Sequence, residues 1–298
     1  PDVKPRLIRL SPNSQQFKVV CEFGDTGTGV VWSGGSLTAM GLMMYIAVHR
    51  TEGAADTLEV WRIQIKQQIV VKKKAVVIDK NPPVVLKVLT ITAASSTLVY
   101  GIVGHYAHHI WLATRGPDLG PPTGVTHTIR HFPTIAWTTP APAVADFDTH
   151  SIVTRSNRIL FFGGSWDGAK WIGQVVSGTT AGVLADLHTI TDTDNCVITA
   201  ATELNGVVYF AYSIFTLAGS VPTITGVKIG SYDGTTWTDV VSMPSLYYAT
   251  LQGITGLAVL GGFLYATPGG SASMLKSPLT GDSAGSWSAI ASGQVSPG

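Results

Sequence analysis

The chain has 298 residues, of which 45% are hydrophobic and only 12% are charged, and its formal net charge is +1. A charge this small gives no long-range field that would attract a polyanion, so nucleic acid is not an expected partner. The longest apolar stretches, residues 39–48 and 254–266, are too short to cross a bilayer, so no membrane insertion is expected.

Residues 1–36 are the least regular part of the sequence. Residues 6–10 and 17–23 have the composition of two strands, and a Gly/Thr/Asp turn follows them. The chain holds two cysteines, Cys21 and Cys196, each inside an apolar run. Two buried thiols are favoured over one disulfide, although the sequence leaves both open.

From residue 37 onward, one pattern recurs: a small or polar turn is followed by a strand that ends in an aromatic residue. Five copies are visible, 48 to 61 residues apart. Their aromatic residues are Tyr45, Tyr100, Phe161, Tyr209 and Tyr265.

Each of these strands has one apolar strand before it and two after it. In the first unit we expect the fourth strand at residues 69–78, and in the second unit we expect the first strand at residues 84–92. A single four-stranded sheet cannot bury both faces, whereas sheets packed radially bury them and leave only short edges. The sequence therefore predicts an all-β fold, a β-propeller of four-stranded antiparallel blades. A pair of β-sandwiches or an irregular barrel is the competing interpretation.

Five blades are expected, with six as the alternative. Residues 1–36 are expected to close the ring, and residues 37–298 to form the blades. The expected blades cover residues 37–80, 84–137, 147–190, 195–243 and 248–292.

Residues 202–243 show the four-strand pattern most clearly. Asn205-Gly206 is a strong hairpin signal, because a type I′ turn needs positive φ at both central residues. Asp233-Gly234 predicts a second hairpin in the same way. Residues 216–225 between them are rich in Pro, Gly, Ser and Thr and are expected to form a long loop.

Two stretches in the last units place Asp, Gly and Trp at a characteristic spacing. They read Ser-Tyr-Asp-Gly-Thr-Thr-Trp at residues 231–237 and Thr-Gly-Asp-Ser-Ala-Gly-Ser-Trp at residues 280–287. Both resemble the Asp-box turn of sialidase-like propellers, Ser-x-Asp-x-Gly-x-Thr-Trp. The first is one residue short, and the second has its glycine one position late. Gly163-Gly164 followed by Trp171 similarly resembles a kelch repeat. The resemblance implies structural roles in turn capping and inter-blade packing for Asp233, Trp237, Asp282 and Trp287.

Carboxylates near the expected inner strands raise the possibility of a glycosidase, which needs two of them across the sugar bond. The candidates are Asp146 and Asp148, with Glu203 or Asp25 as the partner. The alternative, which we favour, is that Asp146 and Asp148 are turn residues that bond to their own backbone.

A histidine-rich segment follows Tyr100, and His127 and His131 come after it. A metal or pH-sensitive site is possible there, but a polar loop is favoured, and neither a metal nor another cofactor is predicted. The exposed aromatic Trp166 could stack on a sugar. The candidate binding residues are His105, Tyr106, His108, His109, Asp146, Asp148, His150 and Trp166.

Two further polar segments have ordinary explanations. Residues 192–195 alternate oxygen-bearing side chains as a calcium loop does, but they lack its glycine and distal glutamate, so a polar linker is favoured. The lysine run at residues 72–74 is expected to be a solvated turn or a guard on an edge strand rather than a phosphate site.

The sequence predicts no catalytic residues. Low charge and richness in Gly, Thr and Ser are similar to those of propellers on bacteriophage tails and related virion components, which implies a rigid structural or binding module. The expected location is extracellular or on a virion surface, and the expected partners are other protein subunits of an assembly or surface glycans. A glycan-active enzyme and a secreted lectin are the alternatives.

Overall fold

The structure is a computed structural model in which every regular element of the described part is a β-strand. No helix that could span a membrane occurs among the described residues. The structure describes residues 4–10, 17–53, 55–64, 67–72, 75–80, 83–94, 100–115, 129–132, 136–140, 147–155, 157–219, 221–243, 253–269, 274–278 and 287–290.

Three sheets, called the third, fourth and fifth by their order along the chain, have the four consecutive antiparallel strands that the sequence predicts. The third sheet consists of β12 (Asp148–Arg155), β13 (Arg158–Trp166), β14 (Trp171–Gly178) and β15 (Leu184–Ile190). The fourth consists of β16 (Asn195–Leu204), β17 (Val207–Ala218), β18 (Val221–Tyr232) and β19 (Trp237–Ser242). The fifth consists of β20 (Ile254–Leu260), β21 (Phe263–Pro268), β22 (Met274–Pro278) and β23 (Ser288–Ile290).

The fourth sheet confirms one turn of the sequence analysis and corrects one loop. Asn205 and Gly206 have φ of 52° and 84°, as the two-residue turn between β16 and β17 requires. The expected long loop at residues 216–225 is instead largely paired, because β17 and β18 continue to a tight turn at Gly219, whose φ is 68°. The Thr, Val and Ile residues of this segment suit a pleated strand.

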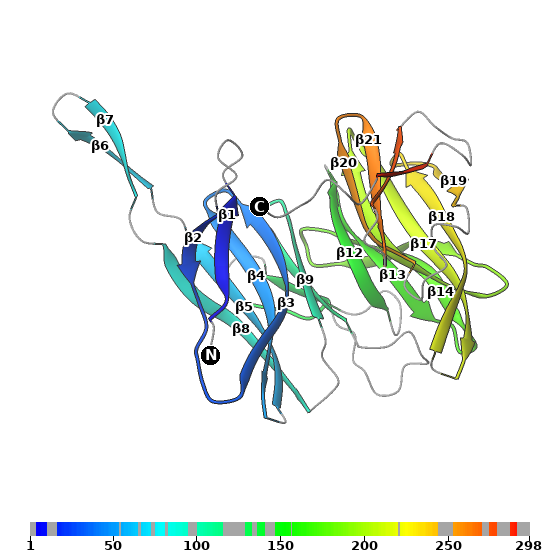
Figure 1. Cartoon of the computed structure of the whole chain (residues 1–298), viewed down its shortest axis with the longest axis horizontal. Coiled ribbons are helices and arrows are strands. Elements are labelled where there is room, and N and C mark those ends of the chain that lie inside the picture. Colours follow the sequence, from blue (N-terminus) through cyan, green and yellow to red (C-terminus); the bar gives the residue numbers. More distant parts are fainter. Residues whose placement is uncertain are drawn as a thin grey trace.

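The first two sheets divide the chain differently from the prediction. The first sheet takes β8 (Val84–Ala94) as its outer strand, so the strand expected to begin the second unit completes the first unit. Residues 69–78, expected as that outer strand, form a separate hairpin of β6 (Gln67–Lys72) and β7 (Ala75–Lys80), which projects from the body in Figure 1. The inner strands of the first sheet are β3 (Val30–Met40), β4 (Met43–Glu52) and β5 (Ala55–Gln64).

The lysine run falls between these two short strands in the sequence. Lys72 ends β6, and the rest of the run lies outside the described residues. The apolar stretches on the two sides of the run pair with each other in a continuous register, from Gln67 with Lys80 to Lys72 with Ala75. The stretch therefore forms two short paired strands instead of one long outer strand.

The second sheet is consequently shifted by one strand along the sequence. Its strands are β9 (Tyr100–Tyr106), β10 (His109–Arg115) and β11 (Ile129–Phe132). Thr138 lies at the place of a fourth strand, because its backbone N–H and C=O both bond to His131, at 2.7 and 2.8 Å. Tyr100, the second aromatic anchor, therefore begins the sheet's first strand, whereas the sequence predicts it at the end of the second.

The N-terminal hairpin of β1 (Arg6–Leu10) and β2 (Phe17–Glu22) lies against the first sheet (Figure 1). Leu7 and Phe23 pack against Ile46 and Val48 of β4. This is the face of the first sheet to which the even-numbered residues of β4 point. The other face of β4 packs through Tyr45 and Ala47 on the second sheet. The hairpin thus occupies the free face of the first sheet; ring closure stays a prediction.

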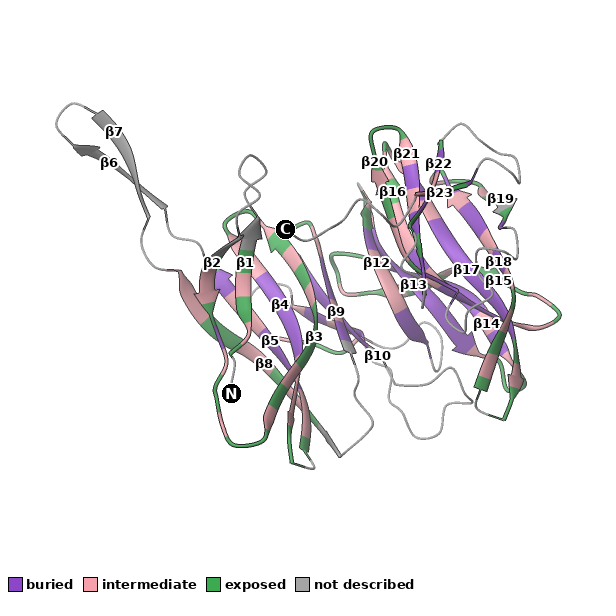
Figure 2. Ribbon diagram, viewed as in Figure 1, coloured by how far each residue is buried: buried purple, intermediate pink, exposed green. Residues whose placement is uncertain are grey.

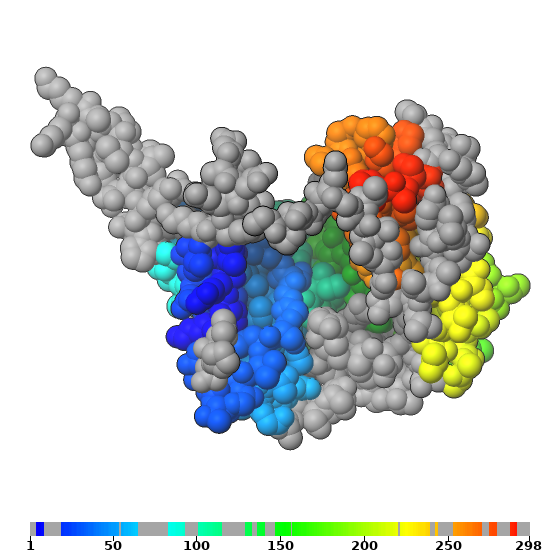
Figure 3. Space-filling view, in the orientation of Figure 1, coloured from blue at the N-terminus to red at the C-terminus, as the bar shows by residue number. Residues whose placement is uncertain are grey.

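The cores lie between neighbouring sheets, which is why the middle strands are the most buried in Figure 2. One core joins the second and third sheets through Trp111 and Phe161, and another joins the third and fourth through Phe162 and Phe210. In Figure 3 the first sheet (blue) and the fifth sheet (orange to red) lie on opposite sides of the view. Sheets packed face to face in sequence order are the arrangement of propeller blades.

Candidate functional site

The first strands of neighbouring sheets run side by side and are joined by short polar side chains. Between β3 and β9, the N–H of Val103 donates to Ser36 Oγ at 3.1 Å, and Thr38 Oγ1 lies 2.8 Å from His105 Nδ1. Between β9 and β12, Thr154 Oγ1 donates to the carbonyl of His105 at 2.6 Å. The contact two residues further along β3 is made with the residue two further along β9, so the two strands run in the same direction.

The same arrangement continues through the remaining sheets. Ser151 Oγ on β12 donates to the carbonyl of Ala201 on β16 at 3.3 Å and accepts from its N–H at 3.2 Å. Gly253, just before β20, approaches Ser213, which pairs with the beginning of β16. All five first strands therefore finish at one end of the molecule, here called the turn end, and begin at the opposite end.

Four of the five first strands carry a one-residue β-bulge. The register skips Gly34 on β3, His150 on β12, Thr199 on β16 and Thr255 on β20. Bulges re-aim side chains and are frequent beside active sites. The sequence pattern does not reveal them, since a bulge changes the register without changing the residue types of the strand.

The predicted histidines lie at the turn end. Ala107 and His108 form the turn between β9 and β10 with φ of 46° and 68°, and His108 is exposed. His105 and Tyr106 end β9 and are half-buried. His109 begins β10, and its Nδ1 lies 2.7 Å from Nε2 of His131 on β11.

His131 lies between two sheets. Its ring stacks on Trp111 at 4.2 Å, and only 4% of the residue is exposed. The loop at Gly182 of the third sheet approaches the same ring. Burial, with a smaller contribution from the charge of His109, lowers the pKa of His131, and burial with the charge of His108 likewise lowers the pKa of His105. These histidines therefore favour the neutral form.

Asp148, His150 and Trp166 lie at the opposite end. Asp148 Oδ2 is 3.1 Å from His150 Nε2, and both side chains are almost completely buried. His150 is the extra residue of the β12 bulge, and its ring lies within reach of the Asp148 carboxylate two residues before it. The structure thus brings this pair together and separates it from the histidines of the turn end. Asp146 lies outside the described residues.

Trp166 belongs to a turn whose repetition the sequence analysis missed. Ser165-Trp166-Asp167-Gly168-Ala169-Lys170-Trp171 matches the pattern of residues 231–237 at Ser, Asp, Gly and Trp, with an aromatic residue in the second place. Asp167 Oδ1 accepts the N–H groups of Ala169 and Lys170, each at 2.8 Å. Trp166 is half-buried and meets the Trp171 ring edge-on at 5.9 Å. A search for S-aromatic-D-G-x-x-W would have found this copy.

Asp233 caps the other copy, between β18 and β19. Its Oδ1 accepts the N–H groups of Thr235 and Thr236, each at 2.8 Å. These hydrogen bonds, those to Thr236 and Thr235 first, lower the pKa of the Asp233 carboxyl. In the same way, the N–H groups of Lys170 and Ala169 lower the pKa of Asp167. One seven-residue pattern therefore builds the same turn at both ends of the molecule.

Trp237 joins the third and fourth sheets through a stack of rings. Its ring lies 3.9 Å from Tyr232 and 4.3 Å from His188 of β15. Arg155 of β12 lies over Tyr232 and donates to the Asp233 carbonyl at 3.0 Å. Trp287 is 5% exposed in the core of the fourth and fifth sheets, and Asp282 lies outside the described residues.

Each described carboxylate considered for glycosidase chemistry is engaged by another group of the chain. Asp25 accepts two hydrogen bonds from Arg50, each at 3.0 Å, and this pairing lowers the pKa of the Asp25 carboxyl. Glu203 accepts the N–H of Gly206 within its own turn, at the turn end. Asp148 pairs with His150 at the opposite end.

The calcium-like segment at residues 192–195 is occupied by amines. Lys170 Nζ donates to the carbonyl oxygens of Asp192 and Thr193, and Lys228 Nζ lies 3.8 Å from Asp192 Oδ2. The lysine ammonium group therefore engages the oxygen atoms that a calcium ion would need as ligands. Within the described ranges, no group of three or more His, Cys, Asp or Glu side chains is placed to hold a metal ion.

The two thiols are free, with Cys196 buried and Cys21 half-buried. Burial raises the pKa of both. The expectation of thiols rather than a disulfide agrees with this arrangement, although Cys21 is less buried than expected.

The sequence matches no family model and no curated protein. Several solved β-propeller structures are similar to the chain. A nidogen/laminin complex covers 96% of this chain and 90% of the matched chain at 11% identity, with a TM-score of 0.43. The match to Trypanosoma rangeli sialidase in complex with sialic acid covers 89% of this chain and 46% of the sialidase chain, at 10% identity and with a TM-score of 0.44. The match to Bacillus subtilis arabinanase covers 83% of this chain and 89% of the arabinanase chain, at 9% identity and with a TM-score of 0.36. The chain spans less than half of the sialidase chain. These similarities are too low to transfer a function.

Proposed function

We propose that the chain is a rigid binding module that attaches to surface glycans or to other subunits of an assembly, and that it does not cleave glycosidic bonds. The proposed setting is an extracellular or virion surface, as on a phage tail. The observation that carries the proposal is the engagement of Asp25, Asp148 and Glu203. Each makes contacts that hold the fold, and Asp148 and Glu203 lie at opposite ends, whereas a glycosidase needs two carboxylates within about 10 Å.

The turn end is the proposed binding surface. Leu42, Val183 and Leu260 lie on turns or strand ends of three different sheets there and are 54%, 58% and 71% exposed. His108 is exposed on the β9–β10 turn of the second sheet. Rigid turns on separate sheets lose little conformational entropy on binding. Several modest contacts, repeated over the copies of a particle, would add up to firm attachment.

A glycan array and a light-scattering measurement of self-assembly test the proposal on the purified chain. Val183→Lys and Leu260→Lys should weaken the binding found, while Val221→Lys, equally exposed at 56% but at the opposite end, should not. Equal loss in all three variants would contradict the turn end as the binding surface. Turnover of a bound glycan that is lost in Asp148→Asn or Glu203→Gln would contradict the non-hydrolytic proposal.

A further inference from the structure

Ser33, His49 and Asp56 lie on three adjacent strands of the first sheet and form a chain of polar contacts. Ser33 Oγ lies 3.1 Å from His49 Nδ1, and His49 Nε2 lies 3.7 Å from Asp56 Oδ1. Ser33 pairs directly with His49, and Asp56 is two residues from the partner of His49 on β5, so all three side chains share one face. This is the order of nucleophile, base and orienting carboxylate in a serine hydrolase.

The exposure of the three side chains suits these roles. Ser33 is exposed, as a nucleophile must be. The side chains of His49 and Asp56 are 13% and 16% exposed, so they are largely shielded from water. The 3.7 Å contact is longer than a hydrogen bond, but catalytic contacts are often long before substrate binds.

The β3 bulge lies directly beside the serine. Gly34 is its extra residue and has no ladder partner on β4, and its φ is 58°. A backbone N–H next to the nucleophile can stabilise the oxyanion formed during acyl transfer. In the first sheet, the bulge therefore adjoins a serine with a histidine partner.

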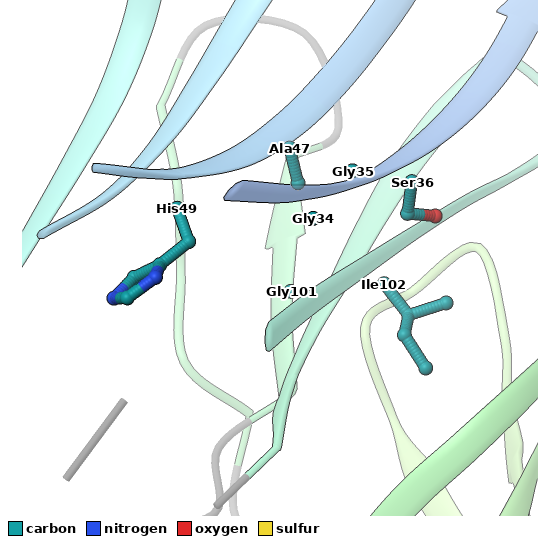
Figure 4. A pocket seen from close by; sticks show the side chains of 7 residues that line it. All are labelled: Gly34, Gly35, Ser36, Ala47, His49, Gly101 and Ile102. Carbon is teal, nitrogen blue, oxygen red and sulfur yellow. The ribbon is translucent and has the colours of Figure 1, made fainter. Parts of the chain in front are cut away.

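A cavity of about 170 Å³ opens at this point, between the first and second sheets. Figure 4 shows its lining, which includes His49 from β4, Gly34 and Gly35 from β3, and Gly101 and Ile102 from β9. Ser33 borders this cavity through the adjacent Gly34 and does not itself line it; with Gly34 and Gly35, Ser33 lines a groove of about 340 Å³ on the side of the β1–β2 hairpin. The cavity is smaller than a drug-sized pocket, so it fits an acyl group of a few carbons.

We propose that Ser33 and His49 are catalytic residues that hydrolyse esters of short-chain carboxylic acids, with Asp56 as a positioning residue. Ser33 Oγ attacks the ester carbonyl carbon while its proton passes to His49 Nδ1. The oxyanion is held by the Gly34 N–H, and its collapse breaks the bond to the alcohol oxygen, which takes the proton from His49. Water, deprotonated by His49, then attacks the acyl carbonyl carbon. The bond between that carbon and Ser33 Oγ breaks, Ser33 Oγ takes the proton back from His49, and the carboxylic acid leaves.

This inference goes beyond the proposed function and does not depend on it. A binding module can carry an ester-cleaving site on its first sheet, about 170 Å³ in size and away from the turn end. It departs from the sequence-based expectation that the chain has no catalytic residues. The acyl chemistry also differs from glycosidase chemistry, because no carboxylate pair is needed.

The test uses the whole chain with p-nitrophenyl acetate as substrate and a fluorophosphonate as a covalent serine probe. Ser33→Ala should lower kcat/KM at least about tenfold, and the probe should label Ser33 in peptide mass spectrometry. Ser242→Ala, an exposed strand serine of the fourth sheet, is the matched control and should keep full activity. A smaller loss in Ser33→Ala, or no label on Ser33, would overturn the proposal.

The positioning role of Asp56 has its own readout. Asp56→Asn should lower kcat and leave KM unchanged, and Asp56→Glu should restore part of kcat, because a carboxylate near His49 Nε2 stabilises the imidazolium formed in the transition state. Thermal unfolding of each variant separates misfolding from lost chemistry. Equal kcat in the Asn and Glu variants, with both folded, would remove Asp56 from the mechanism.

Discussion

Replacing Gly163 by alanine should destabilise the third sheet strongly. A Cβ at this position would lie 1.7 Å from the carbonyl oxygen of Asp148, where ordinary contact needs about 3.5 Å. The next neighbours, Asp148 C at 2.8 Å and Thr149 Cα at 3.1 Å, are also backbone atoms. No rotamer change can therefore relieve the clash, and β12 must move away from β13 together with its bulge.

The cost combines overpacking with broken ladder hydrogen bonds, about 3 kcal/mol of unfolding free energy in total. At about 2–4 °C per kcal/mol, the melting temperature should fall by about 6–12 °C. Urea denaturation followed by tryptophan fluorescence and calorimetry measure the two quantities. Any contact that the shift imposes on the buried Asp148–His150 pair adds to the loss.

Gly35→Ala is the matched control, because Gly35 also lies beside a first-strand bulge. A Cβ there would have its nearest neighbours, Ala47 O and Val48 Cγ1, at 3.7 Å. Alanine also restricts the unfolded chain, so this variant should be unchanged or up to about 1 kcal/mol more stable. If Gly163→Ala and Gly35→Ala unfold at the same urea concentration, the close approach of β12 to β13 at the bulge is wrong.

Four further variants test the contacts between and within the sheets. Ser151→Ala should lower the unfolding free energy by about 1–3 kcal/mol, because both backbone groups of Ala201 lose their partner; an unchanged urea midpoint would contradict the link between the sheets. Asp233→Ala and Asp167→Ala should lower the urea midpoint by similar amounts, since the two turns share their hydrogen bonds; a loss in only one variant would show that the turns are not equivalent. The pKa of His131 is lowered on folding, so the unfolded chain binds the proton first, and stability should fall as the pH drops below about 6.5. His131→Phe should reduce the difference between the urea midpoints at about pH 7.5 and about pH 5.5, and an unchanged difference would assign the effect to other groups.

The sequence by itself determined the local structure wherever a turn fixes the register. Asn205-Gly206 needs positive φ at both residues, and that requirement sets the pairing of β16 with β17. Asp233 accepts the N–H groups that follow it, so the next turn is also encoded within a few residues. The alternating apolar strands of the last three sheets follow from composition and spacing alone, because each strand pairs with its neighbour in the chain.

Only the tertiary structure decided which sheet a strand joins when its partner is not the strand next to it in the sequence. An alternating pattern says that Val84–Ala94 is a strand, but it does not say that β5 is its partner across the β6–β7 hairpin. That choice depends on contacts between residues distant in sequence. Forming them requires closing the loop between the two strands, and no local sequence signal encodes the entropic cost of that closure.

The candidate site depended on the tertiary structure most of all. Ser33, His49 and Asp56 belong to three strands, and no motif or spacing connects them in the sequence. They share one face because two hairpin registers and the bulge at Gly34 place them there. A one-residue change of register would turn each side chain to the other face of the sheet, which is why residue type alone could not predict this arrangement.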